Sequence, residues 1–290
     1  MKIKKFKGHK GGPVNTVAWS MDGQILASGG SDSTIYLWNQ EGKSLKVIDI
    51  PEYEVKYLRW SSDGTLAAIA QKMVRFFDSN GKNIREFEAN AYDKLAWSPD
   101  GKLIASNTID SKINIWDIDG SHIKELTGHT AYVNGIGWSS DGKLFVTASE
   151  DSKIRLWDPN GWNEIKVLSE HYESNTCLVW SPEGQNFAIG AWTYKKKFVR
   201  IYDRNGESTQ TLEGDQDKIM AIDWSNDGKW IISGSSDKTI LIFKPDGTQV
   251  EKIKIGKAVT DVSISPDSQL LAVSLWDDKV HVIDLKELKD

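Results

Sequence analysis

Short stretches of the chain alternate apolar residues with polar or small ones at a period of two, which is the spacing of a β-strand with two different faces. The stretches 14–19 and 133–138, Val-Asn-Thr-Val-Ala-Trp and Val-Asn-Gly-Ile-Gly-Trp, are examples. An Asp-Gly turn follows each, and then a second apolar run such as 25–28 or 144–147. Asp-Gly between two such runs is a strong hairpin signal. The pattern therefore predicts antiparallel strands joined by tight turns.

One five-residue segment recurs along the chain: Trp, Ser, a variable residue, an acidic residue and Gly. Six copies begin at Trp19, Trp60, Trp97, Trp138, Trp180 and Trp224, and a degenerate seventh begins at Ile264. The successive spacings are 41, 37, 41, 42, 44 and 40 residues. Such a period is typical of propeller blades or of helical arrays, and the strand-like alternation favours blades.

Each repeat contains further strand signals after the hairpin. A third apolar run ends at Trp38, Phe77, Trp116, Trp157, Tyr202, Phe243 or Ile283, and in six repeats a Gly-containing turn and a fourth strand follow. These units predict an all-β fold: a seven-bladed β-propeller of four-stranded antiparallel blades, with residues 1–290 as one domain. Because neighbouring blades cover both faces of each sheet, the strands are dense in apolar and small residues.

The two ends of the chain complement each other. Residues 2–7 are similar to the fourth-strand segment 123–127, whereas the last repeat stops after its third strand, 279–284. An unpaired strand edge invites aggregation. We therefore expect the N-terminal strand to pair with the C-terminal blade and close the ring.

The repeats resemble the WD-repeat (WD-40 type) β-propeller family, whose units carry Gly-His before the first strand and Trp-Asp at the end of the third. Gly-His stands at 8–9 and 128–129, and Trp-Asp or a close variant at 38–39, 116–117 and 157–158. In that family a His, a Ser or Thr, an Asp and the Trp form a buried hydrogen-bonded tetrad within one blade. The resemblance implies two full structural tetrads, His9, Ser28, Asp32 and Trp38, and His129, Thr147, Asp151 and Trp157, and a partial set without the His, Ser106, Asp110 and Trp116.

Composition and charge narrow the class of protein. With 36 Lys and Arg against 41 Asp and Glu the net charge is −5, which disfavours general nucleic-acid binding. Cys177 is the single cysteine, so no intramolecular disulfide can form, and no window approaches the length of an apolar membrane span. We therefore expect a cytoplasmic protein, monomeric on its own, that uses neither a metal nor a cofactor.

No catalytic motif stands out. None of the five histidines sits in a recognisable nucleophile context, and the chain lacks a Gly-x-Ser-x-Gly elbow, a phosphate-binding loop and a His-Glu-x-x-His zinc motif. A propeller-based hydrolase would need a titratable cluster in the central channel, and the sequence indicates none. The chain is therefore predicted to be non-catalytic.

The connections between blades vary in sequence, and variable loops on a rigid scaffold frequently carry binding sites. Those before repeats 2 to 5 each bring a Tyr to nearly the same position, and connections between second and third strands add further aromatic residues. Because Tyr and Trp are enriched in interface hot spots, these rings are expected to bind a protein or peptide partner. They are Tyr53, Tyr92, Tyr132, Tyr172, Trp192, Tyr194 and Trp276. The alternative is that the rings pack onto neighbouring blades.

Repeat 5 departs furthest from the others. Its segment 191–197, Ala-Trp-Thr-Tyr-Lys-Lys-Lys, indicates a longer loop in which Lys195, Lys196 and Lys197 follow an aromatic pair. Such a loop suits either an acidic peptide or a nucleic-acid strand, and the net charge favours the peptide. The function predicted is a protein-interaction scaffold or adaptor, with nucleic-acid binding through this loop as the alternative.

Overall fold

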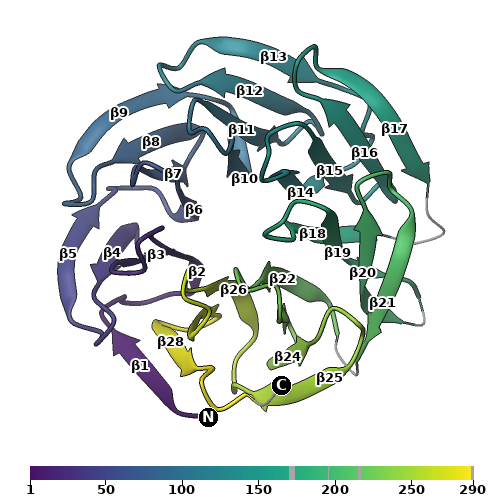
Figure 1. The fold of residues 1–290 in the computed structure, drawn as a ribbon. Helices are drawn as coiled ribbons and strands as arrows, with labels where there is room; N and C mark the ends of the chain where they lie inside the picture. Colours follow the sequence, from purple (N-terminus) through teal and green to yellow (C-terminus); the bar gives the residue numbers. More distant parts are fainter. Residues whose placement is uncertain (170–173, 195, 215–216, 289–290) are drawn as a thin grey trace.

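The computed structural model describes residues 1–169, 174–194, 196–214 and 217–288. They form seven four-stranded antiparallel sheets, arranged as blades around a central channel (Figure 1). The predicted seven-bladed β-propeller is therefore confirmed. No helix in the described part of the chain is long and apolar enough to cross a bilayer.

Each blade runs from an inner strand at the channel to an outer strand at the rim. The inner strands are β2 (Val14–Trp19), β6 (Val55–Trp60), β10 (Ala91–Trp97), β14 (Val133–Trp138), β18 (Ser174–Trp180), β22 (Ile219–Trp224) and β26 (Val259–Ile264). The second strands are β3 (Leu26–Gly30), β7 (Leu66–Ala70), β11 (Leu103–Thr108), β15 (Phe145–Ser149), β19 (Asn186–Trp192), β23 (Ile231–Ser235) and β27 (Leu270–Leu275).

The third strands are β4 (Thr34–Trp38), β8 (Met73–Phe77), β12 (Ile113–Asp117), β16 (Lys153–Asp158), β20 (Lys197–Asp203), β24 (Thr239–Phe243) and β28 (Lys279–Asp284). The outer strands are β5 (Ser44–Asp49), β9 (Asn83–Glu88), β13 (His122–Leu126), β17 (Asn163–Ser169), β21 (Ser208–Glu213), β25 (Gln249–Lys254) and β1 (Ile3–Lys7).

The ring closes as the chain ends predict. The outer strand of the seventh blade is β1, which pairs antiparallel with β28 from Ile3↔Ile283 to Lys7↔Lys279. The two termini consequently lie near each other at the rim (Figure 1). No blade is left with an unpaired third strand.

The recurrent Trp-Ser-x-Asp-Gly segment is a turn with its own hydrogen bonds. Ser20 donates its hydroxyl to the Asp22 carboxylate at 2.6 Å and accepts the amide of Ile25 at 2.9 Å, while Gly23 adopts φ +68°. The same Ser-to-Asp bond recurs in the pairs Ser61–Asp63, Ser98–Asp100, Ser139–Asp141, Ser225–Asp227 and Ser265–Asp267. The motif therefore stabilises the turn between the first two strands of each blade, because its side chains form hydrogen bonds with backbone amides there.

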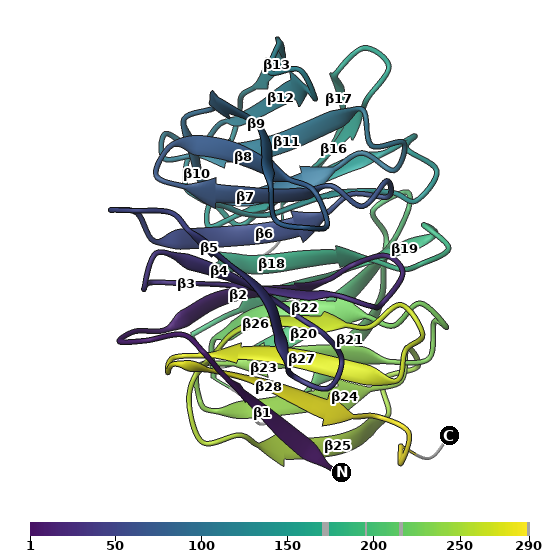
Figure 2. The same cartoon turned by 90° about the vertical axis from the view of Figure 1, so that its left-hand side faces the viewer.

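The blades have two distinct ends. We call the end with the connections from each outer strand to the next blade, and from second to third strands, the loop face; the tight turns form the turn face. In Figure 2 the β1–β2 and β5–β6 connections lie on the left, at the loop face. The predicted loop 191–197 is shorter than expected, because Trp192 and Lys197 pair within β19 and β20 and leave only 193–196 as the connection.

Candidate functional site

The first and fourth blades each hold a continuous hydrogen-bonded chain of four side chains. In blade 4, Trp157 donates to Thr147 at 3.0 Å, Thr147 and His129 Nε2 are 2.8 Å apart, and His129 Nδ1 lies 2.9 Å from Asp151. An indole nitrogen only donates, so the Thr147 hydroxyl oxygen is the acceptor for Trp157 and lies between it and the imidazole. The imidazole ring thus links this hydroxyl to the carboxylate.

Blade 1 repeats this arrangement. Trp38 donates to Ser28 at 2.8 Å, His9 Nε2 lies 2.8 Å from the same hydroxyl, and His9 Nδ1 is 3.0 Å from Asp32. All four side chains are buried or nearly so. In blade 3, which lacks the His, Trp116 still donates to Ser106 at 3.2 Å, but Asp110 bonds Thr108 in its own turn.

We expect Asp151→Ala to lower the free energy of unfolding by about 1 to 3 kcal/mol, the cost of leaving buried donors without an acceptor. Burial alone would raise the pKa of Asp151, but hydrogen bonds from His129 and from backbone amides lower it to about 2. The control is Asp110→Ala, whose carboxylate is exposed and should matter by less than about 0.5 kcal/mol. Urea unfolding measures both, and equal effects would argue against a stabilising tetrad.

Several predicted partner-binding rings gather on the loop face. Tyr92 and Tyr132 stack with centroids 5.7 Å apart and 14° between their planes, and the Lys56 ammonium lies 4.7 Å above Tyr92. Tyr132 is 40% exposed, whereas Tyr53 is partly buried against the core between blades 1 and 2. The structure thus brings two of these four tyrosines together and separates Tyr53 from them. Tyr172 lies outside the described residues.

The connections between second and third strands carry the most exposed aromatic residues. Tyr194 is 85% exposed and Trp276 is 65% exposed, whereas Trp192 is partly buried within β19. Ile109, which was not predicted as a site residue, is 62% exposed on the same face. It precedes the turn aspartate of its repeat, as Trp276 does, where other repeats have Ser or Glu, so an alignment of the repeats would have revealed it.

The lysines of the β19–β20 connection already have partners. Lys196 contacts the Glu213 carboxylate at 2.9 Å, and Lys197 contacts Asp217 at 3.4 Å. Lys195 lies outside the described residues. Because these two ammonium groups are neutralised by neighbouring carboxylates, the geometry gives little support to the alternative of nucleic-acid binding through this loop.

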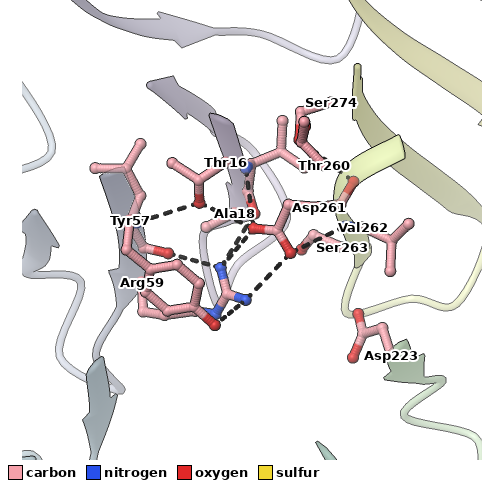
Figure 3. Close-up of polar contacts among 12 residues, drawn as sticks. Thr16, Ala18, Tyr57, Arg59, Asp223, Thr260, Asp261, Val262, Ser263 and Ser274 are labelled. Carbon is pink, nitrogen blue, oxygen red and sulfur yellow. Dashed lines mark hydrogen bonds and ion pairs between the residues drawn. The ribbon is translucent and has the colours of Figure 1, made fainter. Parts of the chain in front are cut away.

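A cluster of charged side chains, not predicted from the sequence, lies in the central channel (Figure 3). Asp261, on β26, accepts the Arg59 guanidinium at 3.0 Å, the Thr16 hydroxyl at 2.9 Å and the Val17 amide at 3.3 Å. Arg59 also bonds the Tyr57 hydroxyl at 2.6 Å. One carboxylate therefore joins the inner strands of blades 7, 1 and 2.

Side chains of one inner strand also cap the amides of the next. Thr16 accepts the Leu58 amide at 3.2 Å, Ser263 accepts the Trp19 amide at 3.2 Å, and Asp223 accepts the Ile264 amide at 2.6 Å. Inner strands have a free edge toward the channel, so these caps satisfy backbone donors that have no neighbouring strand. Such side-chain-to-amide hydrogen bonds join the inner strands of blades 6, 7, 1 and 2 in succession.

Asp223 is the unusual acid of this cluster. Burial raises the pKa of its carboxyl to about 6, against the opposing effect of the amides of Ile264 and Trp224. Arg59 has a raised pKa because Asp261 and Tyr57 outweigh its burial. The carboxyl of Asp223 therefore changes charge just below neutral pH, while the guanidinium stays protonated.

The raised pKa of Asp223 predicts a pH-dependent stability. The folded chain binds this proton more tightly than the unfolded chain, so the stabilisation is full below about pH 4 and is lost as the pH rises through about 6. At pH 5, one unit below the folded pKa, it amounts to about 1.4 kcal/mol. Asp223→Asn should lose this dependence, so its stability relative to wild type should rise between pH 5 and 7.5. Urea unfolding at both pH values tests this, and parallel wild-type and variant values would contradict it.

The channel cluster corrects the prediction that no titratable groups gather there. Arg59 and Asp261 lie 202 residues apart in sequence, and ring closure alone brings them together. The cluster does not resemble a hydrolytic site, because Arg59 and Asp261 bind each other and Asp223 accepts a backbone amide. Among the described residues there is also no group of three or more His, Cys, Asp or Glu placed to hold a metal ion.

Seven four-stranded blades, two of which hold a Trp-Ser/Thr-His-Asp tetrad, define a propeller built from WD-type repeats. A family model described as WDR19 first beta-propeller matches residues 93–269, and one described as WD domain, G-beta repeat matches residues 1–39. The first covers more than half of the chain. The chain belongs to the WD-repeat β-propeller family.

Individual relatives are similar along much of the chain. THO complex subunit 3 of Arabidopsis thaliana is 27% identical over 95% of this chain and 90% of its own length. The ribosome biogenesis protein WDR12 homolog of Drosophila persimilis is 30% identical over 63% of this chain, which spans 49% of that relative. The periodic tryptophan protein 2 homolog of Dictyostelium discoideum is 26% identical over 94% of this chain, which spans 32% of it.

These relatives overturn one prediction. The cytoplasmic location expected from composition is wrong, since the relatives are named as a THO complex subunit and a ribosome biogenesis protein, which points away from a purely cytoplasmic protein. Composition could not have shown this, because a reducing environment and a soluble surface are common to both compartments. None of the three names describes an enzyme.

Proposed function

We propose that this chain is a non-catalytic scaffold that holds a protein or peptide partner on its loop face. The observation that supports this most directly is the exposure of large apolar side chains there. Four such side chains are between 40% and 85% exposed, so most of their surface contributes nothing to the core: Ile109, Tyr132, Tyr194 and Trp276. Exposed aromatic residues on a rigid frame are typical of interface hot spots.

The geometry of the tyrosine pair strengthens the proposal. The stacked Tyr92 and Tyr132 come from neighbouring blades, so their spacing is set by the scaffold and little side-chain freedom remains to be lost on binding. The Lys56 ammonium lies over Tyr92 and 3.6 Å from the Glu54 carboxylate, so a salt bridge flanks the stack. A partner with an exposed apolar segment fits this surface.

The names of the relatives are consistent with work inside larger assemblies. One relative is a subunit of the THO complex and another is a ribosome biogenesis protein. We extend this to the present chain as part of the proposal: it serves as one subunit of a multi-protein assembly, with the loop face as a contact surface.

The test is a chemical cross-linking and capture experiment with two matched triple variants. The loop-face variant carries Ile109→Ala, Tyr132→Ala and Trp276→Ala; the rim variant carries Ile84→Ala, Ile123→Ala and Ile165→Ala, which remove similarly exposed residues from the outer strands. After both are shown to melt like wild type, partners should be lost from the loop-face variant alone. Loss from the rim variant alone would overturn the proposal.

A further inference from the structure

A small cavity of about 190 Å³ occupies the central channel. All seven inner strands line it, and they do so with residues near their first ends, such as Asn15, Lys56, Asn134 and Thr260. Every inner strand starts at the loop face, so the cavity lies in the half of the channel next to that face. It is smaller than the sites that hold drug-sized ligands, which are at least about 300 Å³.

One cationic group that lines the cavity makes no hydrogen bond within the described part of the chain. Arg59 is bonded to Asp261, and Lys56 lies 3.6 Å from the Glu54 carboxylate. The Lys94 ammonium lies 4.9 Å above the Tyr57 ring, and nearby charges, Asp93 first, raise its pKa against the effect of burial, but no described residue accepts a hydrogen bond from it. Its three N–H donors are therefore available to an acceptor in the cavity.

The carboxylates that line the cavity already have donors of their own. Two of them are in the lining, Asp93 and Asp261. Asp261 is bonded to Arg59, and Asp93 accepts the Asn107 amide at 2.8 Å. The hydrogen-bond donors of Lys94 are therefore the ones left for an added acceptor such as an anion.

Small residues line the side of the cavity formed by β14, β18 and β22. Three residues before the end of the inner strand, where β2 has Thr16 and β26 has Asp261, these strands have Gly135, Cys177 and Ala221. These three residues line the cavity and place no charged group there. Between β14 and β18 the bond across blades comes instead from Asn134, which donates to the Asn175 carbonyl at 3.2 Å.

We propose that this cavity binds a carboxylate group, with the Lys94 ammonium as its hydrogen-bond donor and the Gly135–Cys177–Ala221 side accommodating its short carbon chain. The cavity volume of about 190 Å³ is enough for an acid the size of a glutamate side chain, since one water needs only about 10 to 15 Å³ by the same measure. The carboxylate belongs either to a free small acid or to an acidic side chain of the loop-face partner; only the second source rests on the proposed function.

The rate of Cys177 alkylation measures whether the cavity is occupied. Cys177 is the only cysteine of the chain, it lines the cavity, and it is 7% exposed. A reagent can therefore reach it only through the cavity or when the blades open transiently. The probe is propionate, compared with its uncharged equivalent propionamide at constant ionic strength, and the reagent is neutral iodoacetamide. At about ten times its dissociation constant, propionate should slow alkylation about tenfold. Equal protection by propionamide, or none by propionate, would overturn the proposal.

Variants at Lys94 distinguish binding of propionate by the ammonium group from a general stabilisation of the fold by propionate. Lys94→Met keeps the aliphatic chain and should abolish protection by propionate, whereas Lys94→Arg should retain it. Lys72→Met, which removes an exposed lysine of the same face, is the matched control and should behave like wild type. Melting temperatures establish that each variant folds. Protection that persists in Lys94→Met would overturn the assignment.

The two sources of the carboxylate give different results. If the ligand is a free acid, a set of small mono- and dicarboxylates will include one that protects Cys177 at far lower concentration than propionate. If it is a partner side chain, no free acid will do so, and Lys94→Met will lose partner capture. Unchanged capture by the loop-face triple variant would overturn the proposed function but leave propionate protection intact.

Discussion

Removal of residues 1–7 should destabilise the propeller severely and make it aggregate. The deletion takes away β1, the outer strand of blade 7, and with it the ladder to β28. It also removes Phe6, which is 3% exposed and packs 5.6 Å from the Trp38 ring. Loss of such a buried aromatic side chain alone costs about 3 to 5 kcal/mol. Thermal melting and size-exclusion chromatography measure the two effects.

A second variant distinguishes the contribution of the Phe6 side chain from that of the backbone pairing between β1 and β28. Phe6→Ala should lower the melting temperature but keep the protein monomeric, because the backbone of β1 still covers the edge of β28. Lys5→Ala, an exposed position on the same strand, should change neither property. A deletion variant that stays monomeric with an unchanged melting temperature would show that β1 does not hold the ring together.

The fold could be predicted because its signals are local and repeated. The hydroxyl of Ser20 and the carboxylate of Asp22 satisfy a turn within six residues of chain, and the same chemistry appears in blade after blade. Ring closure followed from a similarity between two segments, 2–7 and 123–127, which needs no knowledge of distant contacts. Local chemistry and periodicity are therefore sufficient for this architecture.

The channel cluster could not be predicted in the same way. In sequence, Arg59 and Asp261 are polar residues of half-buried strands, and nothing near either one indicates its partner. Their contact exists only because the seventh blade returns to the first. Lys94 carries no local signal either, since a lysine in a strand is most often a solvated side chain. Sites formed across the ring axis depend on closure and are not visible in any one repeat.

The aromatic residues of the loop face fall between these two cases. The Tyr before repeats 3 and 4 could be aligned by position, and the structure stacks Tyr92 on Tyr132. The same alignment also selected Tyr53, which turns into the core between blades. Position along a repeat predicts where a backbone lies, whereas the direction of a side chain depends on the space that its neighbours leave.

Asp261→Ala should be among the most damaging single substitutions in the channel. The carboxylate is buried and accepts from two neighbouring blades, through Arg59, the Thr16 hydroxyl and the Val17 amide. Removing one partner of a buried charge pair typically costs about 3 to 5 kcal/mol, because the remaining groups lose their compensation. The Arg59 side chain is 30% exposed, which favours the lower end of this range. Urea unfolding measures the loss.

A double-mutant cycle identifies the source of that loss. Arg59→Met combined with Asp261→Ala should be less destabilising than the sum of the two single variants, since each removes the same contact. The exposed pair Lys196–Glu213 is the control, and its coupling should be below about 1 kcal/mol.

Hydrogen exchange gives a local test of the bond between blades. In Asp261→Ala the amide of Val17 loses its acceptor, so its exchange should accelerate more than that of Leu58, whose cap on Thr16 remains. Uniform acceleration of both amides would mean that the substitution loosens the whole domain. Faster exchange confined to Val17 would instead show that a single carboxylate joins the last blade to the first on the channel side, as β1 does at the rim.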